Sequence, residues 1–206
     1  MSTAASERLV RTLRRHIFDE RVLAAVAAVP RDRFVPRDLL PEAWENIPLP
    51  IGAGQTISQP LVVARMCELL ELTGSESVLD VGTGSGYHAA LLARLARHVY
   101  SIEVHASLSR SAAANLRAAG VENVTLTVGD GSRGLPAHAP YDAINVAAAS
   151  RHGVPSALAE QLTPRGRLVI PLSGRGGQRL VLARRSGDGL ELEHHDRVRF
   201  VPLVGG

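Results

Sequence analysis

The sequence contains no lysine: all 23 of its basic residues are arginine. Guanidinium groups stay charged far above neutral pH, so the isoelectric point is about 9.7 although the formal net charge is only +3. The high isoelectric point is therefore not a sign of nucleic-acid binding. The arginines near the N-terminus, from Arg8 to Arg21, lie at helical spacing, which is more typical of a solvated helix face than of a phosphate-binding stripe. We expect no nucleic-acid partner.

Cysteine is scarce, and long apolar runs and metal-binding patterns are absent. Cys67 has no cysteine partner and lies in an apolar helical pattern, which predicts a core thiol in a reducing compartment. No apolar run could span a bilayer and the N-terminal segment lacks an apolar signal core, so we expect a cytoplasmic protein without a membrane partner. No H-x-x-x-H or C-x-x-C pattern occurs, and the adjacent His194 and His195 would face opposite sides of a strand, so we expect no metal.

The composition that is present is that of an ordinary globular protein, with 206 residues of which 45% are hydrophobic and 21% charged. This length predicts one domain, 1–206. Within it, 1–60 would form N-terminal helices and a loop, and 61–206 an α/β core. We expect a monomer.

From residue 60 onward, apolar helices alternate with short apolar strands. The predicted helices are 60–71, 87–96, 106–118 and 155–162, and the predicted strands are 77–81, 98–103, 123–128, 142–147 and 166–171. Such alternation predicts a three-layer α/β/α sandwich with a mostly parallel, doubly wound sheet that helices cover on both faces. Two further β-rich runs, 179–185 and 190–201, flank the turn 186–189 and predict an antiparallel C-terminal hairpin at the sheet edge.

The N-terminal part of the chain has a different character. Residues 1–45 predict two short helices, the second ended by Val29-Pro30 because the residue before a proline avoids the helical conformation. The segment 48–60, PLPIGAGQTISQP, contains three prolines and two glycines, which exclude a regular helix or a central strand. We expect an ordered loop or a lid there.

A buried strand runs into a glycine-rich turn and then into a helix in the segment 78–87, VLDVGTGSGY. Such a turn brings backbone amides and a helix N-terminus to a ligand. The glycines fall at every second position, 82, 84 and 86, whereas a dinucleotide fingerprint needs G-x-G-x-x-G, which argues against NAD. With Asp80 at the strand end, the pattern resembles the first motif of class I S-adenosylmethionine-dependent methyltransferases.

That resemblance implies a Rossmann-like methyltransferase fold and S-adenosylmethionine as cofactor. The candidate cofactor-binding residues of this segment are Asp80, Gly82, Thr83, Gly84, Ser85, Gly86 and Tyr87. Glu103 ends the next strand, where a carboxylate can accept hydrogen bonds from both ribose hydroxyls. Asp130 and Gly131 follow the third strand, where methyltransferases of this fold commonly place an acid that accepts from the adenine amino group. Alternatively, Asp80 or Glu103 caps a helix and Asp130 serves a turn.

The segment 49–60, LPIGAGQTISQP, resembles the hallmark loop of protein-L-isoaspartate O-methyltransferases almost residue for residue. The runs 28–36, 129–131, 166–171 and 198–203 resemble the same family in the same order, so the likeness covers essentially the whole chain. It implies methyl transfer from S-adenosylmethionine to the free α-carboxylate of L-isoaspartyl residues in damaged proteins and peptides, with S-adenosyl-L-homocysteine as product. The ester then recloses to a succinimide, whose hydrolysis returns some normal aspartate.

The resemblance gives Ser58 the active-site role, with a hydroxyl that orients the acceptor carboxylate. Thr56 and Gln59 are candidates for binding the substrate backbone, and Ile57 for closing over the reaction centre. No catalytic triad is expected, because a carboxylate is ionised at neutral pH and the sulfonium methyl is already activated. The alternative role for Ser58 is to cap the helix that is predicted to start near Pro60.

Four residues depart from the family pattern, namely His88, Ser132, Asn145 and Ala147. They line the expected crevice, so they bear on substrate preference. Asn145, on a buried strand, needs a hydrogen-bond partner.

Two alternative functions remain open. One is an aspartate O-methyltransferase dedicated to a natural-product peptide, a class characterised by an added C-terminal domain. The other is a catalytically silent S-adenosylmethionine-binding protein, which is disfavoured because Ser58, Glu103 and Asp130 are all present. A nucleic-acid methyltransferase would be expected to carry a basic face or an N-P-P-Y motif, and neither occurs in the sequence.

Overall fold

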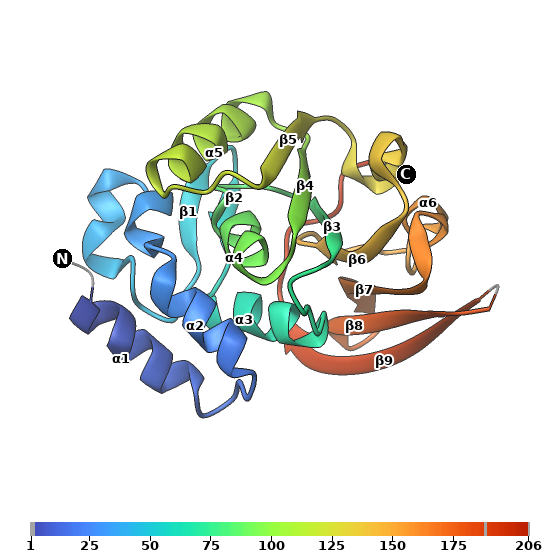
Figure 1. Ribbon diagram of the computed structural model, residues 1–206, viewed down its shortest axis with the longest axis horizontal. Helices are drawn as coiled ribbons and strands as arrows, with labels where there is room; N and C mark the ends of the chain where they lie inside the picture. Colours follow the sequence, from blue (N-terminus) through green and yellow to red (C-terminus); the bar gives the residue numbers. More distant parts are fainter. Residues whose placement is uncertain (1–2, 188, 206) are drawn as a thin grey trace.

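The computed structural model describes residues 3–187 and 189–205. Its centre is a seven-stranded sheet in the order β5-β4-β3-β6-β7-β8-β9 (Figure 1). The strands are β3 (Ser77–Val81), β4 (His98–Glu103), β5 (Val124–Val128), β6 (Tyr141–Val146), β7 (Leu162–Gly174), β8 (Gly177–Ser186) and β9 (Gly189–Val198). Neighbouring strands from β5 to β7 pair in parallel, whereas β8 and β9 pair antiparallel. The predicted mostly parallel sheet with an antiparallel C-terminal hairpin is therefore confirmed.

The predicted strand 190–201 ends earlier than expected, at Val198. Beyond it, the Gln178 side chain takes over the pairing: its Nε2 donates to the Phe200 carbonyl at 3.1 Å and its Oε1 accepts from the Phe200 amide at 2.6 Å. The chain then leaves the sheet and bonds to Ala149, whose amide donates to the Val201 carbonyl at 2.8 Å. The turn predicted at 186–189 connects β8 and β9, although its third residue lies outside the described part.

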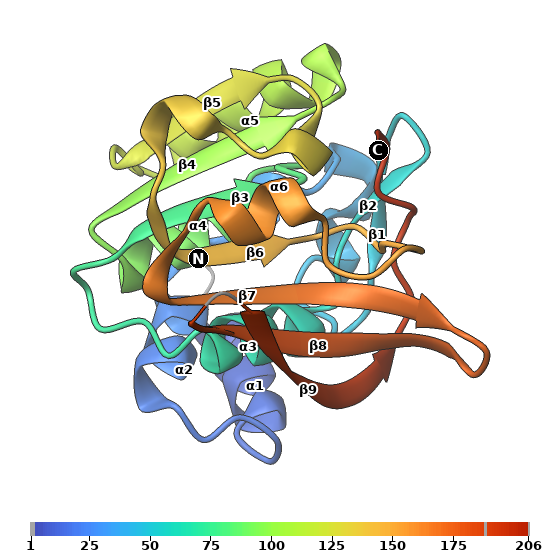
Figure 2. The same cartoon turned by 90° about the vertical axis from the view of Figure 1, so that its right-hand side faces the viewer.

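Helices cover both faces of the sheet. They are α1 (Thr3–Leu13), α2 (Glu20–Ala28), α3 (Pro60–Leu69), α4 (Tyr87–Leu95), α5 (Ala106–Ala118) and α6 (Ser156–Glu160). Figure 2 shows α6 in front of β6, with α4 behind the sheet. Short 3₁₀ segments, which the sequence pattern did not predict, lie at Arg31–Phe34, Arg37–Glu42, Gly131–Arg133 and Pro136–His138. The three-layer α/β/α arrangement is confirmed, and no described helix is long and apolar enough to cross a membrane.

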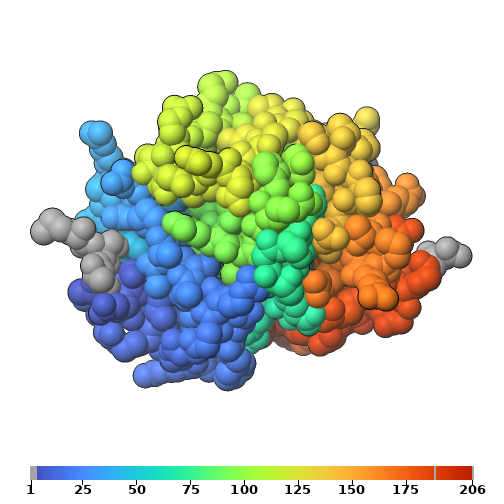
Figure 3. Space-filling model, in the orientation of Figure 1, coloured from blue at the N-terminus to red at the C-terminus, as the bar shows by residue number. Residues whose placement is uncertain are grey.

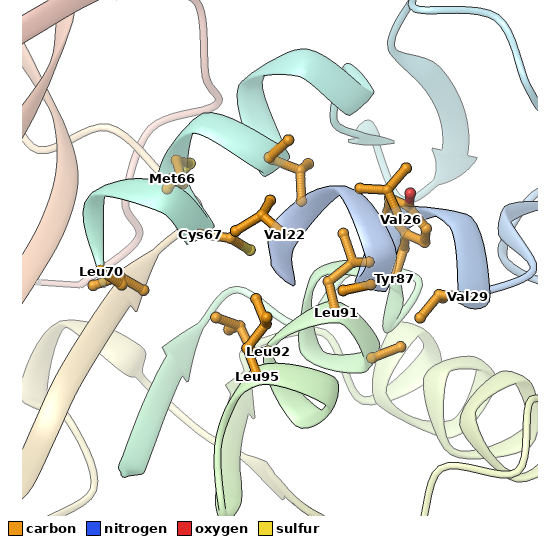
Figure 4. Close-up of a cluster of buried hydrophobic side chains, with 14 of the residues drawn as sticks. Val22, Val26, Val29, Met66, Cys67, Leu70, Tyr87, Leu91, Leu92 and Leu95 are labelled. Atoms are coloured by element: carbon orange, nitrogen blue, oxygen red, sulfur yellow. The ribbon is translucent and has the colours of Figure 1, made fainter. Parts of the chain in front are cut away.

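Alternation along the strands divides the core in two. In β3, Val78 packs toward the cluster that contains α2, α3 and α4, whereas Leu79 and Val81 pack toward the cluster that contains α6. The first cluster is drawn in Figure 4, where side chains from α2, α3 and α4 meet. Cys67 lies inside it and is buried, so the predicted core thiol is confirmed. Burial raises the pKa of this thiol well above its ordinary value.

The N-terminal helices are confirmed where the sequence placed them. Asp19 caps α2 by accepting hydrogen bonds from the amides of Arg21 and Val22, and α2 ends at Ala28, just before Val29-Pro30. In the space-filling view, the blue N-terminal segment lies directly against the green middle part of the chain (Figure 3).

Candidate active site

A cavity of about 460 Å³ opens at the carboxyl ends of β3, β4 and β6. This is the edge at which parallel α/β sheets place their ligands. Eleven of the predicted site residues line it: Thr56, Ile57, Ser58, Gln59, Gly82, Thr83, Gly84, Ser85, Tyr87, Glu103 and Gly131. Asp80, Gly86 and Asp130 lie outside the lining. The structure thus brings the glycine turn and the 48–60 segment, which are distant in sequence, to one site.

The glycine turn is held in a shape that L-residues rarely adopt. Gly86 has φ of 91° and serves as the N-cap of α4, and its amide donates to the Thr83 carbonyl at 2.9 Å. A Cβ on Gly86 would also lie 3.2 Å from the Leu116 side chain and 3.3 Å from that of Ala112. Gly86 therefore shapes the turn from behind rather than facing the cavity.

Glu103 lies where β4 ends and is only 5% exposed. One of its carboxylate oxygens accepts from the Gly84 amide and the other from the His105 amide, each at 2.9 Å. It therefore holds the glycine turn and also supports the start of α5, whose N-cap is His105. Each oxygen keeps a further lone pair for a ligand hydroxyl, so ribose binding stays a prediction that this geometry permits.

Asp80 lies behind the cavity wall and is fully buried. Its carboxylate accepts from Ser101 Oγ at 2.7 Å and from Asn145 Nδ2 at 2.7 Å. Burial raises the pKa of Asp80 to about 6, while the two hydrogen bonds lower it and the nearby Glu103 raises it. Asn145 Nδ2 thus has the partner that its buried position required, whereas Asn145 Oδ1 has none among the described residues.

The two partners of Asp80 each reach a residue of the cavity wall. Ser101 Oγ lies 2.6 Å from Thr83 Oγ1, and Asn145 Nδ2 lies 3.2 Å from His88 Nδ1. Burial lowers the pKa of His88 to about 3, so this imidazole is neutral at physiological pH. The sequence marked His88 and Asn145 only as departures and did not indicate Ser101 at all, because these contacts join separate strands.

Asp130 stabilises a turn, which was its alternative role. Its Oδ1 accepts from the Ser132 amide at 2.9 Å and from Ser132 Oγ at 2.7 Å, which caps the 3₁₀ segment that begins at Gly131. Gly131 itself forms cavity wall, and a Cβ there would lie only 2.5 Å from the Val81 side chain. The adenine contact of Asp130 stays a prediction.

The 48–60 segment is an ordered hairpin apart from the main sheet. Strands β1 (Leu49–Gly52) and β2 (Gln55–Ile57) pair antiparallel, with Leu49 opposite Ile57. The exclusion of a central strand is confirmed, but the prolines and glycines did permit this short pair, joined by a turn in which Ala53 has φ of 51°. Ile51 packs within 3.3 Å of where a Cβ on Gly84 would lie, so the hairpin touches the glycine turn.

Ser58 follows β2 and is half-buried in the cavity wall. It does not cap α3, whose N-cap residue is Gln59. Instead, Asn46 Oδ1 accepts from the Leu61 amide in the first turn of α3, at 3.0 Å. The position of Ser58 is therefore free of the structural duty that was its alternative role.

Arg31 holds the Ser58 backbone from behind. It is fully buried, with Nε donating to the Ala43 carbonyl at 2.9 Å and NH2 donating to the Ser58 carbonyl at 3.0 Å. Its guanidinium also lies 4.7 Å from the centre of the Tyr87 ring. The sequence did not single out Arg31, although a charged residue between Pro30 and Pro36 in a family-like run was the available signal.

The end of β9 and the chain beyond it form a further wall. Residues 197–204 line the cavity, and the Leu203 amide donates to the Ala149 carbonyl at 2.9 Å. The run 198–203 was noted for its family likeness without a role. This run lines the cavity because it folds back onto Ala149, a contact that no local sequence pattern indicates.

Comparisons with known proteins point to one family. The family model described as protein-L-isoaspartate(D-aspartate) O-methyltransferase (PCMT) matches residues 4–206. A protein-L-isoaspartate O-methyltransferase of Roseiflexus castenholzii is 53% identical over 194 residues, which are 94% of this chain and 88% of the relative. One of Myxococcus xanthus is 52% identical over 198 residues, with 94% and 93% covered.

Solved structures show the same likeness. A protein-L-isoaspartate O-methyltransferase structure superposes with a TM-score of 0.88 at 28% identity, covering 98% of this chain and 66% of that one. A Plasmodium falciparum structure, described as a beta-aspartate methyltransferase in complex with S-adenosyl-L-homocysteine, has a TM-score of 0.81 at 24% identity and covers 95% and 96%. With its hairpin, glycine turn and C-terminal wall all inside the matched range, the chain belongs to the protein-L-isoaspartate(D-aspartate) O-methyltransferase family.

Proposed function

We propose that the protein transfers a methyl group from S-adenosylmethionine to the free α-carboxylate of L-isoaspartyl residues in damaged proteins and peptides. The observation that carries the proposal is the meeting of two walls in one cavity. Residues 82–85 and Tyr87 of the glycine turn form one wall, and Thr56, Ile57, Ser58 and Gln59 form the other. Family membership supports the choice of reaction.

The cavity fits the cofactor. Its volume of about 460 Å³ lies within the range of roughly 300–1,000 Å³ that is typical of small-molecule sites. Thr83, Gly84 and Ser85 offer backbone and hydroxyl groups to the amino-acid part, and Glu103 offers a carboxylate to the ribose. Gly131 lets the wall stay close to Val81 beside the adenine position. When bound, S-adenosylmethionine supplies a methyl group on a positively charged sulfur.

The residues of the hairpin then position the acceptor. The Ser58 hydroxyl donates a hydrogen bond to the substrate carboxylate, which is already ionised at neutral pH and needs no general base. Ile57, which is 3% exposed, helps to exclude water from the reaction centre. Thr56 and Gln59 bind the substrate backbone. Catalysis then rests on in-line positioning of the carboxylate and the methyl group.

We also propose that the whole chain acts as one methyltransferase domain in a reducing compartment such as the cytoplasm. One hydrophobic cluster joins Leu9 of α1 to Leu182 of β8, which supports a common core. The buried Cys67 thiol supports the compartment.

The test is mass spectrometry of a short L-isoaspartyl peptide incubated with the protein and S-adenosylmethionine. The proposal predicts the gain of one methyl group that is lost under mild alkali as the succinimide forms, and no gain in the same peptide with L-aspartate. Binding of S-adenosylhomocysteine without methylation of either peptide would contradict it. That result would instead favour a dedicated peptide substrate or a silent binder.

A further inference from the structure

The buried Asp80 carboxylate is the centre of a hydrogen-bond network that the reaction itself does not require. Each of its oxygens accepts one bond at 2.7 Å, from Ser101 on β4 and from Asn145 on β6. All three side chains are fully buried on neighbouring strands, so water does not compete for these bonds. The network reaches the cavity in two directions, through Thr83 and through His88.

The first direction fixes the proton of the Thr83 hydroxyl. A serine hydroxyl has one proton, and Ser101 gives its proton to the Asp80 carboxylate. In the 2.6 Å contact with Thr83, Ser101 Oγ must therefore be the acceptor and Thr83 the donor. The Thr83 oxygen is left with lone pairs only. The cavity wall at Thr83 is accordingly an acceptor, which suits an ammonium group.

The second direction fixes the tautomer of His88. The Asn145 amide must turn Nδ2 toward Asp80, because the opposite orientation would set its carbonyl oxygen 2.7 Å from a carboxylate oxygen. The second proton of Nδ2 then faces His88 Nδ1, which accepts it at 3.2 Å. In a neutral imidazole the remaining proton must lie on Nε2. His88 is 7% exposed, and its Nε2 has no hydrogen-bond partner among the described residues.

We propose that Ser101 and Asn145 are positioning residues. Because both bond to the Asp80 carboxylate, they fix the hydrogen-bonding roles of two residues of the cavity wall, so that Thr83 is an acceptor and His88 Nε2 is a donor. Such a pair complements a zwitterionic α-amino-acid group, with the ammonium held at Thr83 and the carboxylate served by His88. Assigning that group to the cofactor's amino-acid part rests on the proposed function. The unpartnered Nε2 is a buried donor whose cost a ligand acceptor would remove.

The test compares two ligands by calorimetry. S-adenosylhomocysteine carries the amino-acid group, whereas 5′-methylthioadenosine shares the nucleoside and sulfur but lacks it. Ser101→Ala and Asn145→Leu are each expected to weaken S-adenosylhomocysteine by about tenfold, the loss of one well-placed polar contact, and to leave 5′-methylthioadenosine within about twofold. Ser6→Ala, which removes another buried serine hydroxyl far from the cavity, should change neither ligand.

Equal weakening of both ligands would show that the two residues serve only the fold and would overturn the proposal, as would unchanged binding of both. Failure of the wild-type protein to bind either ligand would overturn the proposed function instead.

The tautomer of His88 tests the proposed hydrogen-bond network without a ligand. Nitrogen-15 NMR is expected to show the proton on Nε2 in the wild type and a mixture in Asn145→Leu. A wild-type proton on Nδ1 of His88, or no change in the variant, would overturn the proposal.

Discussion

The two walls of the cavity differ in how firmly they are built. The wall proposed to bind the cofactor, called the cofactor wall and defined as 82–88 with Glu103, is supported from behind by Asp80 and its two buried hydrogen-bond partners, Ser101 and Asn145. The wall proposed to bind the substrate, called the substrate wall and defined as 55–59 with 197–204, is open: Thr56 and Arg197 are exposed and Ser58 is half-buried. A wall that meets one unchanging ligand can be preorganised, whereas a wall that meets many peptide sequences must leave them room.

The open wall is nevertheless fixed at its base. Arg31 bonds the Ser58 carbonyl from inside the core and lies against the Tyr87 ring of the cofactor wall. Burial lowers the pKa of this guanidinium. Its hydrogen bonds go to the carbonyls of Ala43, Ile47 and Ser58, and it forms no ion pair with a carboxylate of the described residues. The two walls therefore differ in how exposed their cavity-facing residues are, although both pack on the same core.

Replacing Arg31 should have the largest effect. Arg31→Met would leave the carbonyls of Ala43, Ile47 and Ser58 without their buried donor, which is expected to cost about 4 kcal/mol in the free energy of unfolding. Chemical denaturation measures this cost. Arg33→Met removes an exposed arginine from the same 3₁₀ segment and should change stability little. Equal stability of the two variants would contradict the anchoring role.

The buried Asp80 behind the cofactor wall predicts that the free energy of unfolding depends on pH. Its pKa of about 6 is raised above the ordinary 3.8, so the unfolded chain ionises first. The contribution of Asp80 to stability is full below about pH 4 and falls as pH rises through 6, by about 3 kcal/mol in all. Its titratable neighbours are Glu103, Cys67 and His88.

Denaturation of the wild type and of Asp80→Asn across this pH window isolates the contribution. The stability difference between the two should shift in favour of the variant as pH rises, since the amide does not titrate. A difference that stays constant from pH 4 to 7 would show that Asp80 is not desolvated as the structure has it.

Ser58→Ala should affect the substrate wall without affecting the cofactor wall. Loss of the hydroxyl that orients the acceptor is expected to lower kcat by about tenfold, the worth of one hydrogen bond, with cofactor affinity unchanged. Steady-state methyl transfer together with calorimetry separates the two quantities. If turnover is unaffected, Ser58 has no part in orienting the acceptor.

The smallest effect is expected at Asp130. Asp130→Asn removes the charge but keeps a side-chain oxygen that can accept from Ser132, so the turn should survive. If Asp130 also contacts adenine, S-adenosylhomocysteine should bind less tightly by about 1 kcal/mol. Affinity equal to the wild type would restrict Asp130 to its turn.

The sequence predicted the parts of the fold that repeat a local pattern. Strands with alternating or continuous apolar residues were located within a few residues, because burial on a sheet face imposes that pattern. The helix before Val29-Pro30 was located by its proline. The sequence missed the β1–β2 pair, since prolines and glycines argue against strands, and it extended β9 to residue 201 although Gln178 replaces the backbone pairing after Val198.

The candidate site shows the same division. The glycine turn and the 48–60 segment were found because their residues lie together in sequence. Arg31 and Ser101 were not found, because each acts through contacts with residues far along the chain: Arg31 with Ser58, and Ser101 with Asp80 and Thr83. Local patterns locate a wall of the cavity but not what supports it from behind.

The proposed activity is tested most directly by the partition of labelled methyl groups between two peptides in one reaction. Equal amounts of an L-isoaspartyl peptide and its L-aspartyl counterpart would compete for the protein with labelled S-adenosylmethionine, and the peptides would be separated before counting. We predict base-labile label on the isoaspartyl peptide alone. Label shared equally between the two peptides, or label on the aspartyl peptide alone, would contradict it.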